Sequence, residues 1–279
     1  MDSRAPTLRS KAKWLAVIVL LSAATVAAIH ALNSHLHHTY VDYGGPQKSL
    51  RVMSWNIGRV YLRWESRASD GDLAYVARVI SQVNPHVVAL QEIRDAKQLS
   101  RLVAMLGRNW RGRVPQDSYD RRAALLVRLS ASFVQLPTST GRTAQAALVK
   151  LPAGREILVA SIHLDAFDPK RRMLQAEEIV AGLERRARED IFLAGDFNFD
   201  VASTASSPDQ GLYQFLTGSF VDAGKSAGAT TLNARRLDYL FFRSPRLAPR
   251  RARVLRNRRV DSLDHHPLVI EFELNHPAG

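Results

Sequence analysis

The sequence has no cysteine among its 279 residues, which excludes a disulfide framework, a thiolate metal site and a cysteine nucleophile. It also has no internal repeat and no low-complexity tract. Apolar segments are spread evenly after residue 48, and nothing in their distribution separates two domains. We therefore predict one large domain over residues 49–279.

Long apolar runs are scarce, and the one that is present covers residues 14–32 after a basic tail, residues 1–13. About 20 apolar residues span a bilayer as a helix, and a basic flank predicts a cytoplasmic tail. We predict a single-pass transmembrane anchor, a polar linker over residues 33–48, and a domain on the extracytoplasmic side, periplasmic or extracellular. The alternatives are a cleaved signal segment, which would release a secreted protein, and a buried helix.

Acidic residues are few, 26 against 39 Lys and Arg, and the formal net charge is +13. Eight arginines and no acid lie between Arg243 and Arg259. Arginine suits bidentate contacts to phosphate oxygens, so an anionic partner is expected. Charge alone does not distinguish nucleic acid from anionic lipid, or either from a solvated basic surface.

Short β-type runs alternate with amphipathic helical stretches from residue 50 onward. Strands are predicted at residues 50–56, 86–91, 123–128, 146–151, 156–163, 191–194, 237–242 and 267–274, and helices at 72–83 and 170–188. The three strands between residues 123 and 163 follow one another through turns, which predicts antiparallel neighbours in a mixed sheet.

Five polar motifs stand at the ends of apolar runs. They are Ser54-Trp55-Asn56, Gln91-Glu92, Ser161-Ile162-His163-Leu164, Gly195-Asp196-Phe197-Asn198 and Asp264-His265-His266-Pro267. Oxygen ligands such as Glu92 and Asp264 suit a hard divalent cation, and histidine exchanges protons near neutral pH. Each motif alone has a structural explanation, as a turn, an edge strand or a core histidine. Together they predict metal-assisted hydrolysis of a phosphoester.

Residues 50–274 resemble the endonuclease/exonuclease/phosphatase superfamily, the DNase I-like hydrolases, in a bacterial-type membrane-anchored form. The matching pieces occur in the family's order: Asn56, Glu92 after Ala-Leu-Gln, His163 before Leu, Asp196 and Asn198 in Gly-Asp-Phe-Asn, Asp238 in Leu-Asp-Tyr-Leu-Phe, and Asp264-His265. The resemblance implies an α/β fold, a four-layer sandwich of two sheets with helices on both outer faces.

The resemblance also implies a divalent cofactor, Mg²⁺ or Mn²⁺. Glu92 would be the principal metal ligand, helped by Asn56 and Asp264. His265, oriented by Asp238, would act as a general base or polarise the phosphate.

Other site residues follow from the same resemblance. Asp196 and Asn198 would position water and phosphate, and His163 would contact the phosphate or protonate the leaving oxygen. Arg172 and Gln175 resemble an Arg-x-x-Gln helix motif of the family. They would bind the substrate or, alternatively, support His163.

One departure from the family pattern lies before the Asp-His pair. Leu263 stands where family members usually have serine, and Ser262 lies one residue earlier, which puts a serine hydrogen bond to the site in doubt. The leading functional hypothesis is a metal-dependent phosphodiesterase, a nuclease acting on nucleic acid. The alternatives are a phospholipid or sphingomyelin phosphodiesterase or phosphatase, and a catalytically idle, basic, membrane-tethered binding module. Nothing in the sequence indicates a protein partner.

Overall fold

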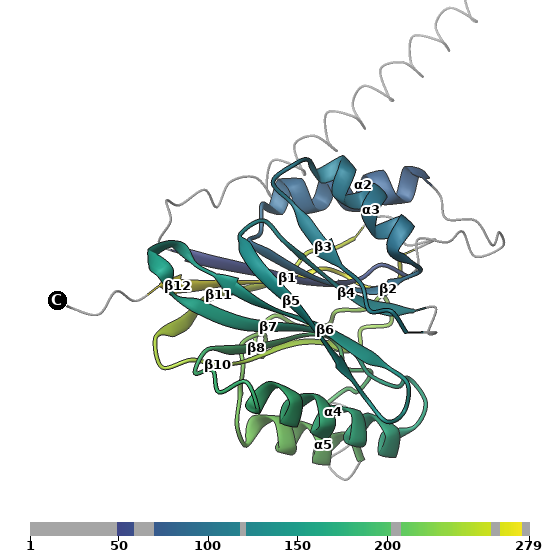
Figure 1. Cartoon of the computed structure of the whole chain (residues 1–279). Coiled ribbons are helices and arrows are strands. Elements are labelled where there is room, and N and C mark those ends of the chain that lie inside the picture. The colour runs from purple at the N-terminus through teal and green to yellow at the C-terminus, as the bar shows by residue number, and fades with distance from the viewer. Residues whose placement is uncertain (1–48, 59–69, 118–120, 202–207, 258–262, 275–279) are drawn as a thin grey trace, which may run out of the picture. The chain divides into compact units, whose positions relative to one another are not determined.

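Two six-stranded sheets lie face to face between two pairs of helices (Figure 1). The computed structural model describes residues 49–58, 70–117, 121–201, 208–257 and 263–274. The predicted tail, membrane segment and linker lie outside these ranges. Within the described part of the chain, no helix is both long and apolar enough to cross a membrane.

The arginine-rich part of the chain forms one edge strand of the first sheet, and a strand of three residues forms the other edge. In spatial order it holds β11 (Leu247–Val254), β12 (Leu268–Leu274), β1 (Ser49–Asn56), β2 (Val87–Ile93), β4 (Arg122–Val127) and β3 (Arg111–Arg113). β1 and β2 run parallel, and the other neighbouring pairs run antiparallel. A parallel pair needs a crossover, which contains helix α2 (Asp70–Val83).

The second sheet repeats this arrangement with another parallel pair at its centre. In spatial order it holds β5 (Ser130–Pro137), β6 (Thr143–Lys150), β7 (Glu156–His163), β8 (Ile191–Asp196), β10 (Asp238–Arg243) and β9 (Val221–Asp222). β7 and β8 are the parallel pair, and helix α4 (Pro169–Glu184) lies in their crossover. A 3₁₀ turn, η2 (Pro152–Gly154), separates β6 from β7.

The helices cover the outer faces of the two sheets. α2 and α3 (Ala96–Leu106) lie on the first sheet, and α4 and α5 (Pro208–Thr217) lie on the second (Figure 1). Asp95 caps α3 by accepting a hydrogen bond from the backbone N–H of Gln98. Asp168 caps α4 in the same way, and Pro169 follows it in the first turn, where the missing N–H costs no helical hydrogen bond.

Apolar side chains fill the space between the sheets. Phe272 of the first sheet contacts Phe192 and Phe242 of the second, with ring centroids 5.1 and 5.0 Å apart. A separate core joins the second sheet to its helices, where Ile179 and Leu183 of α4 pack with the sheet's apolar residues. Complete burial of such a side chain contributes roughly 1.5–3 kcal/mol, so these two layers hold the strand ends in fixed positions.

The two-sheet sandwich with helices outside confirms the predicted fold, but several elements differ from the prediction. The three strands between residues 123 and 163 are not all neighbours, because β4 pairs with β2 in the first sheet while β6 and β7 belong to the second. The prediction omitted α3, α5, β3, β5, β9 and β11. β5 and β11 are largely exposed edge strands with weak apolar alternation, so their sequences resemble loops. α4 ends at Glu184 and not at Arg188.

Candidate active site

The five motifs meet because of the direction of their strands. Asn56 ends β1, and its neighbour in the parallel register of β2 is Gln91. His163 ends β7 opposite Asp196 of β8. β10 runs antiparallel to β8, so its first residue, Asp238, lies opposite Asp196. The polar ends of both sheets therefore share one edge of the sandwich.

Asp196 is the centre of this edge and is almost fully buried. Its Oδ2 accepts a 2.9 Å hydrogen bond from Asn56 Nδ2, and its Oδ1 accepts a 2.9 Å bond from the backbone N–H of Asn198. The Nε2 atoms of His163 and His265 lie 3.7 and 3.8 Å from Oδ2. Burial raises the pKa of Asp196, with Asp238 adding to this effect against the opposing influence of the histidines and Asn56. We call these five groups, Asp196, Asn56, His163, His265 and Asp238, the Asp196 cluster.

His265 is oriented by Asp238, as the resemblance implies. Its Nδ1 lies 2.8 Å from Asp238 Oδ2, and its backbone oxygen accepts a hydrogen bond from Trp55 Nε1. Burial alone would lower the pKa of this imidazole, but the carboxylates of Asp238 and Asp196 outweigh it and raise the pKa to about 10. His265 is therefore a cation near neutral pH, with its Nε2–H directed toward Asp196.

His163 has the opposite protonation preference. Its Nδ1 lies 3.1 Å from the backbone oxygen of Arg121, an acceptor, so this nitrogen carries the proton and Nε2 is left unprotonated. Burial lowers the pKa of His163 to about 4, with Arg142 adding to the effect and Asp196 opposing it. The site thus contains one neutral and one cationic histidine on either side of one carboxylate.

Glu92 projects from an irregular point of β2. The pairing of β2 with β4 shifts register between Leu90 and Ile93, and Glu92 has a positive φ of 59°. Such irregularities redirect a side chain next to an active site. The Glu92 carboxylate is largely buried, and its partner is Arg121 Nη1 at 3.6 Å. The loop before β4, which gave no sequence signal, thereby contributes to the site.

The three predicted metal ligands are not equally placed. Glu92 and Asn56 stand at adjacent strand ends and supply carboxylate and carboxamide oxygens, which fit a Mg²⁺ ion that keeps several waters. Asp264 is exposed, and its backbone oxygen accepts a hydrogen bond from Leu232. In the described residues no contact joins Asp264 to the other two, and no three His, Asp or Glu side chains group as a metal site. Ser262 is outside the described ranges, and Leu263 is buried.

The side chain of Asn198 is hydrogen-bonded to the backbone and does not extend freely into the site. Its Nδ2 donates to the oxygen of Leu164 at 3.0 Å, and its φ of 54° lies in the left-handed region that asparagine tolerates. Gly195 precedes it where β8 passes very close to Ile162 of β7, leaving no room for a side chain. The Gly-Asp-Phe-Asn motif is thus partly a packing requirement.

Arg172 and Gln175 are both buried, and they hold the loop that follows His163 and Leu164. Gln175 Oε1 accepts from the backbone N–H of Asp165, and Arg172 donates to the oxygen of Asp165 and to Asp209 of α5. The two side chains therefore brace this loop, and their contact with substrate stays a prediction. The same loop carries Phe167, whose side chain is exposed.

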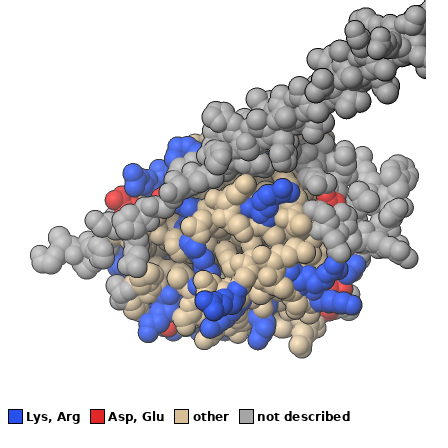
Figure 2. All heavy atoms as spheres, turned by 90° about the horizontal axis from the view of Figure 1, so that it is seen from above, with Lys and Arg blue, Asp and Glu red and all other residues tan. Residues whose placement is uncertain are grey.

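The first half of the arginine-rich segment lies at the end of the sheets opposite the Asp196 cluster. Arg243 ends β10 at the side opposite Asp238 and donates to Glu184 with both terminal nitrogens, at 2.7 and 2.9 Å. Arg246 forms an ion pair with Glu189. Arg256 alone among the described arginines of the segment follows β11 toward the site. In the face shown by Figure 2, basic side chains lie in separate groups and not in one continuous patch.

Comparison with known proteins decides the family. Residues 53–265 match the sequence model of the Endonuclease/Exonuclease/phosphatase family. The chain belongs to this family. No curated protein matches the sequence of this endonuclease/exonuclease/phosphatase family member.

Solved structures of similar fold are distant in sequence from this family member. An endonuclease/exonuclease/phosphatase from Beutenbergia cavernae is 20% identical with a TM-score of 0.69, covering 83% of this chain and 73% of the other. A mannosyl-6-phosphatase from Bacteroides thetaiotaomicron is 20% identical with a TM-score of 0.63, covering 80% and 99%. The human Nocturnin catalytic domain is 19% identical with a TM-score of 0.62, covering 82% and 94%. These likenesses establish the fold.

Proposed function

We propose that this chain is a divalent-metal-dependent phosphodiester hydrolase and that its preferred substrate is nucleic acid. The observation that carries the proposal is the Asp196 cluster. Two buried histidines of opposite protonation preference direct Nε2 atoms at one carboxylate, which Asn56 binds from the other sheet. Membership of a family of phosphoester hydrolases supports assigning this cluster to catalysis.

Hydrolysis of a phosphodiester needs one group that accepts a proton from water and another that stabilises or protonates oxygen. His163, neutral with an unprotonated Nε2, is suited to accept the proton. His265, cationic and held by Asp238, is suited to polarise a phosphoryl oxygen or protonate the leaving oxygen. Asp196 lies within reach of both and holds the two Nε2 atoms around one reaction space.

Glu92 and Asn56 would hold the divalent ion, with Asp264 as a further ligand predicted from sequence. When bound, Mg²⁺ or Mn²⁺ supplies Lewis-acid stabilisation of phosphoryl oxygens. Arg121 Nη1 lies 3.6 Å from Glu92 Oε1 and partly balances the negative charge of this carboxylate.

Nucleic acid is favoured as the substrate by charge and by one aromatic side chain. The chain has a net charge of +13, and Arg256 is exposed beside residues that contact the histidine motif. Phe167 is 91% exposed on the loop that Gln175 and Arg172 brace, four residues after His163. A nucleobase can stack on such a ring, and this contact does not depend on base sequence.

The same exposed aromatic is the observation that favours a phospholipid or sphingomyelin phosphodiesterase as a second candidate. Phe167 lies on the loop after His163, and the exposed Leu232 is hydrogen-bonded through its backbone to Asp264, next to His265. A membrane surface would cover both apolar side chains. Tyr239, Phe241 and Phe242 are buried and offer no such contact.

Turnover by the full-length chain tests the proposal. Single- and double-stranded DNA, RNA, sphingomyelin micelles and soluble phosphate esters are offered with Mg²⁺ or Mn²⁺, with His265→Ala alongside. Metal-dependent cleavage of nucleic acid that is lost in His265→Ala supports the proposal. Cleavage confined to lipid or to a phosphomonoester overturns the choice of nucleic acid as substrate. If the native chain turns over none of the esters and Glu92→Ala binds its ligand as the native chain does, the result supports a binding module.

A salt titration with matched arginine variants tests the substrate contact. Arg256→Gln should weaken nucleic-acid binding and reduce the slope of log affinity against log salt by about one, because one phosphate contact is lost. Arg246→Gln removes the same charge at the opposite end of the strands and should leave the slope unchanged. Identical slopes for both variants and the native protein would contradict a backbone contact at Arg256.

A further inference from the structure

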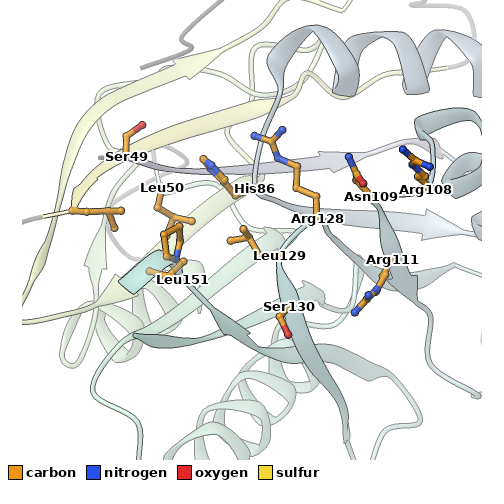
Figure 3. A pocket seen from close by; sticks show the side chains of 12 residues that line it. Ser49, Leu50, His86, Arg108, Asn109, Arg111, Arg128, Leu129, Ser130 and Leu151 are labelled. Atoms are coloured by element: carbon orange, nitrogen blue, oxygen red, sulfur yellow. The ribbon is translucent and has the colours of Figure 1, made fainter. Parts of the chain in front are cut away.

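A cavity of about 560 Å³ lies at the end of the sheets opposite the Asp196 cluster (Figure 3). Ser49 lines it at the start of β1, whose other end is Asn56. Leu274 lines it at the end of β12, the strand that starts just after the histidine motif. β1 has eight residues, so the cavity and the catalytic residues lie roughly 25 Å apart. The cavity is therefore independent of the proposed catalytic site.

The walls of this cavity carry positive charge without a compensating acid. Arg108, Arg111 and Arg128 line it, and no carboxylate is among the described residues that do so. Arg128 Nη2 donates to the backbone oxygen of Asn84 at 3.1 Å. Within the described ranges, none of the three arginines forms an ion pair. Burial and then repulsion from Arg51 lower the pKa of Arg128.

His86 adds a neutral hydrogen-bond donor to the same walls. Its Nδ1 accepts a 3.0 Å hydrogen bond from the backbone N–H of Arg51, so the ring proton is on Nε2. Burial, with the charges of Arg128 and then Arg51 adding to the effect, lowers the pKa of His86 to about 4. The imidazole is therefore an N–H donor and not a base within the cavity at neutral pH.

The donors stand on two sides of the space. Figure 3 shows His86 and the guanidinium of Arg128 near each other on one side, while Arg111 extends its guanidinium toward the side of Ser130. Guanidinium forks, an imidazole N–H and a hydroxyl together match the several acceptor oxygens of one phosphate group. The volume lies within the range of small-ligand sites, about 300–1,000 Å³.

We propose that this cavity is a binding site for a phosphate group, carried by a soluble phosphomonoester or by the headgroup of an anionic phospholipid. The chemistry is the same for both sources: an oxyanion between guanidinium groups that have no carboxylate partner. A lipid source is consistent with the sequence, because Ser49 directly follows the linker predicted to lead from the membrane segment. The site is separate from catalysis and does not depend on the proposed substrate.

The test uses the full-length chain in detergent, without phosphate in the buffer and without divalent ions. Isothermal titration with inorganic phosphate and with glycerol 3-phosphate forms one arm. Binding to micelles containing phosphatidic acid, compared with phosphatidylcholine, forms the other. One variant is Arg111→Gln, and the double variant combines Arg108→Gln with Arg111→Gln. Both positions are exposed, so the substitutions leave the core intact. Arg185→Gln removes one exposed arginine elsewhere and is the charge control.

The proposal predicts that the double variant weakens phosphate or phosphatidic acid binding at least tenfold, while Arg185→Gln changes it less than twofold. Loss in the soluble arm assigns a phosphomonoester, and loss in the micelle arm alone assigns the lipid headgroup. His265→Ala separates this cavity from the Asp196 cluster and should bind as the native chain does. Equal affinity in the double variant, loss of binding in His265→Ala, or no binding of any probe by the native chain overturns the proposal.

Discussion

Asn56 Nδ2 donates a 2.9 Å hydrogen bond to Asp196 Oδ2, and this bond links the end of β1 in the first sheet to the end of β8 in the second. Both side chains are only 2% exposed. A buried hydrogen bond to a carboxylate is stronger than one at the surface, and its loss leaves a charge without its donor. The relative position of the two sheets is therefore part of the geometry of the proposed catalytic site.

Asn56→Asp replaces that donor with a second carboxylate against Asp196. Repulsion between two buried acids should lower kcat by roughly two orders of magnitude and destabilise the fold by about 1–3 kcal/mol. Steady-state kinetics on the substrate found to turn over, together with urea unfolding, measure both effects. Gln135→Glu, the same type of change on exposed β5, should alter neither. A native kcat in Asn56→Asp would remove Asn56 from the site.

Glu92→Gln tests the metal site. The amide keeps the shape of the side chain but removes the charge that attracts a divalent cation, so the Mg²⁺ concentration for half-maximal activity should rise at least about tenfold. Activity is measured as a function of free Mg²⁺ after the metal has been removed with a chelator. Glu273→Gln changes an exposed glutamate on β12 and should leave the Mg²⁺ dependence unchanged. An unchanged Mg²⁺ dependence in Glu92→Gln would contradict its role as a ligand.

Gly195→Ala tests the close passage of β8 against β7. The added Cβ would overlap the backbone of Ile162, which cannot move as a flexible side chain would. We expect a loss of about 3 kcal/mol or more in the free energy of unfolding. Gly182→Ala is the matched control, because its Cβ would meet the flexible side chains of Leu136 and Arg185 and no backbone, and α4 gains from alanine. Similar melting temperatures for the two variants would refute the packing explanation.

His86 predicts an acid-dependent loss of stability. The unfolded chain binds a proton at this histidine below about pH 6.5, whereas the folded protein binds it only below about pH 4. Protons therefore favour the unfolded state. The stability contribution is complete above pH 6.5 and is lost as the pH falls to 4, by at most about 3 kcal/mol. Urea unfolding between pH 4 and 7.5 should be less pH-dependent in His86→Gln. Equal pH dependence in both proteins would contradict the lowered pKa.

Much of the fold follows from local patterns. The alternation of strand and helix before Asp196 predicts the order strand, helix, strand, and β7, α4 and β8 confirm this order. That β7 and β8 run parallel is seen only in the structure. Local patterns failed where strands lie at sheet edges. β5 and β11 are edge strands with few fully buried residues, so their apolar signal is weak. β4 pairs in the other sheet from β6 because strand pairing depends on contacts distant in sequence.

Single residues in the site show the same division. The motifs placed His163, Asp196 and His265 at strand ends, because a polar residue that ends a buried strand is visible in the sequence. Whether each histidine is neutral or cationic depends on the groups that surround it after folding, namely the oxygen of Arg121 for one and the carboxylate of Asp238 for the other.

The sequence by itself determined the family, the two kinds of secondary structure and the identity of the polar residues that end the strands. It did so because side-chain periodicity and strand-end chemistry are local properties of the chain. Only the tertiary structure decided that Asn56 contacts Asp196, that Arg172 braces a loop, and that Arg243 points away from the site. These relationships join segments far apart in sequence, and their geometry exists only once the two sheets have packed against each other.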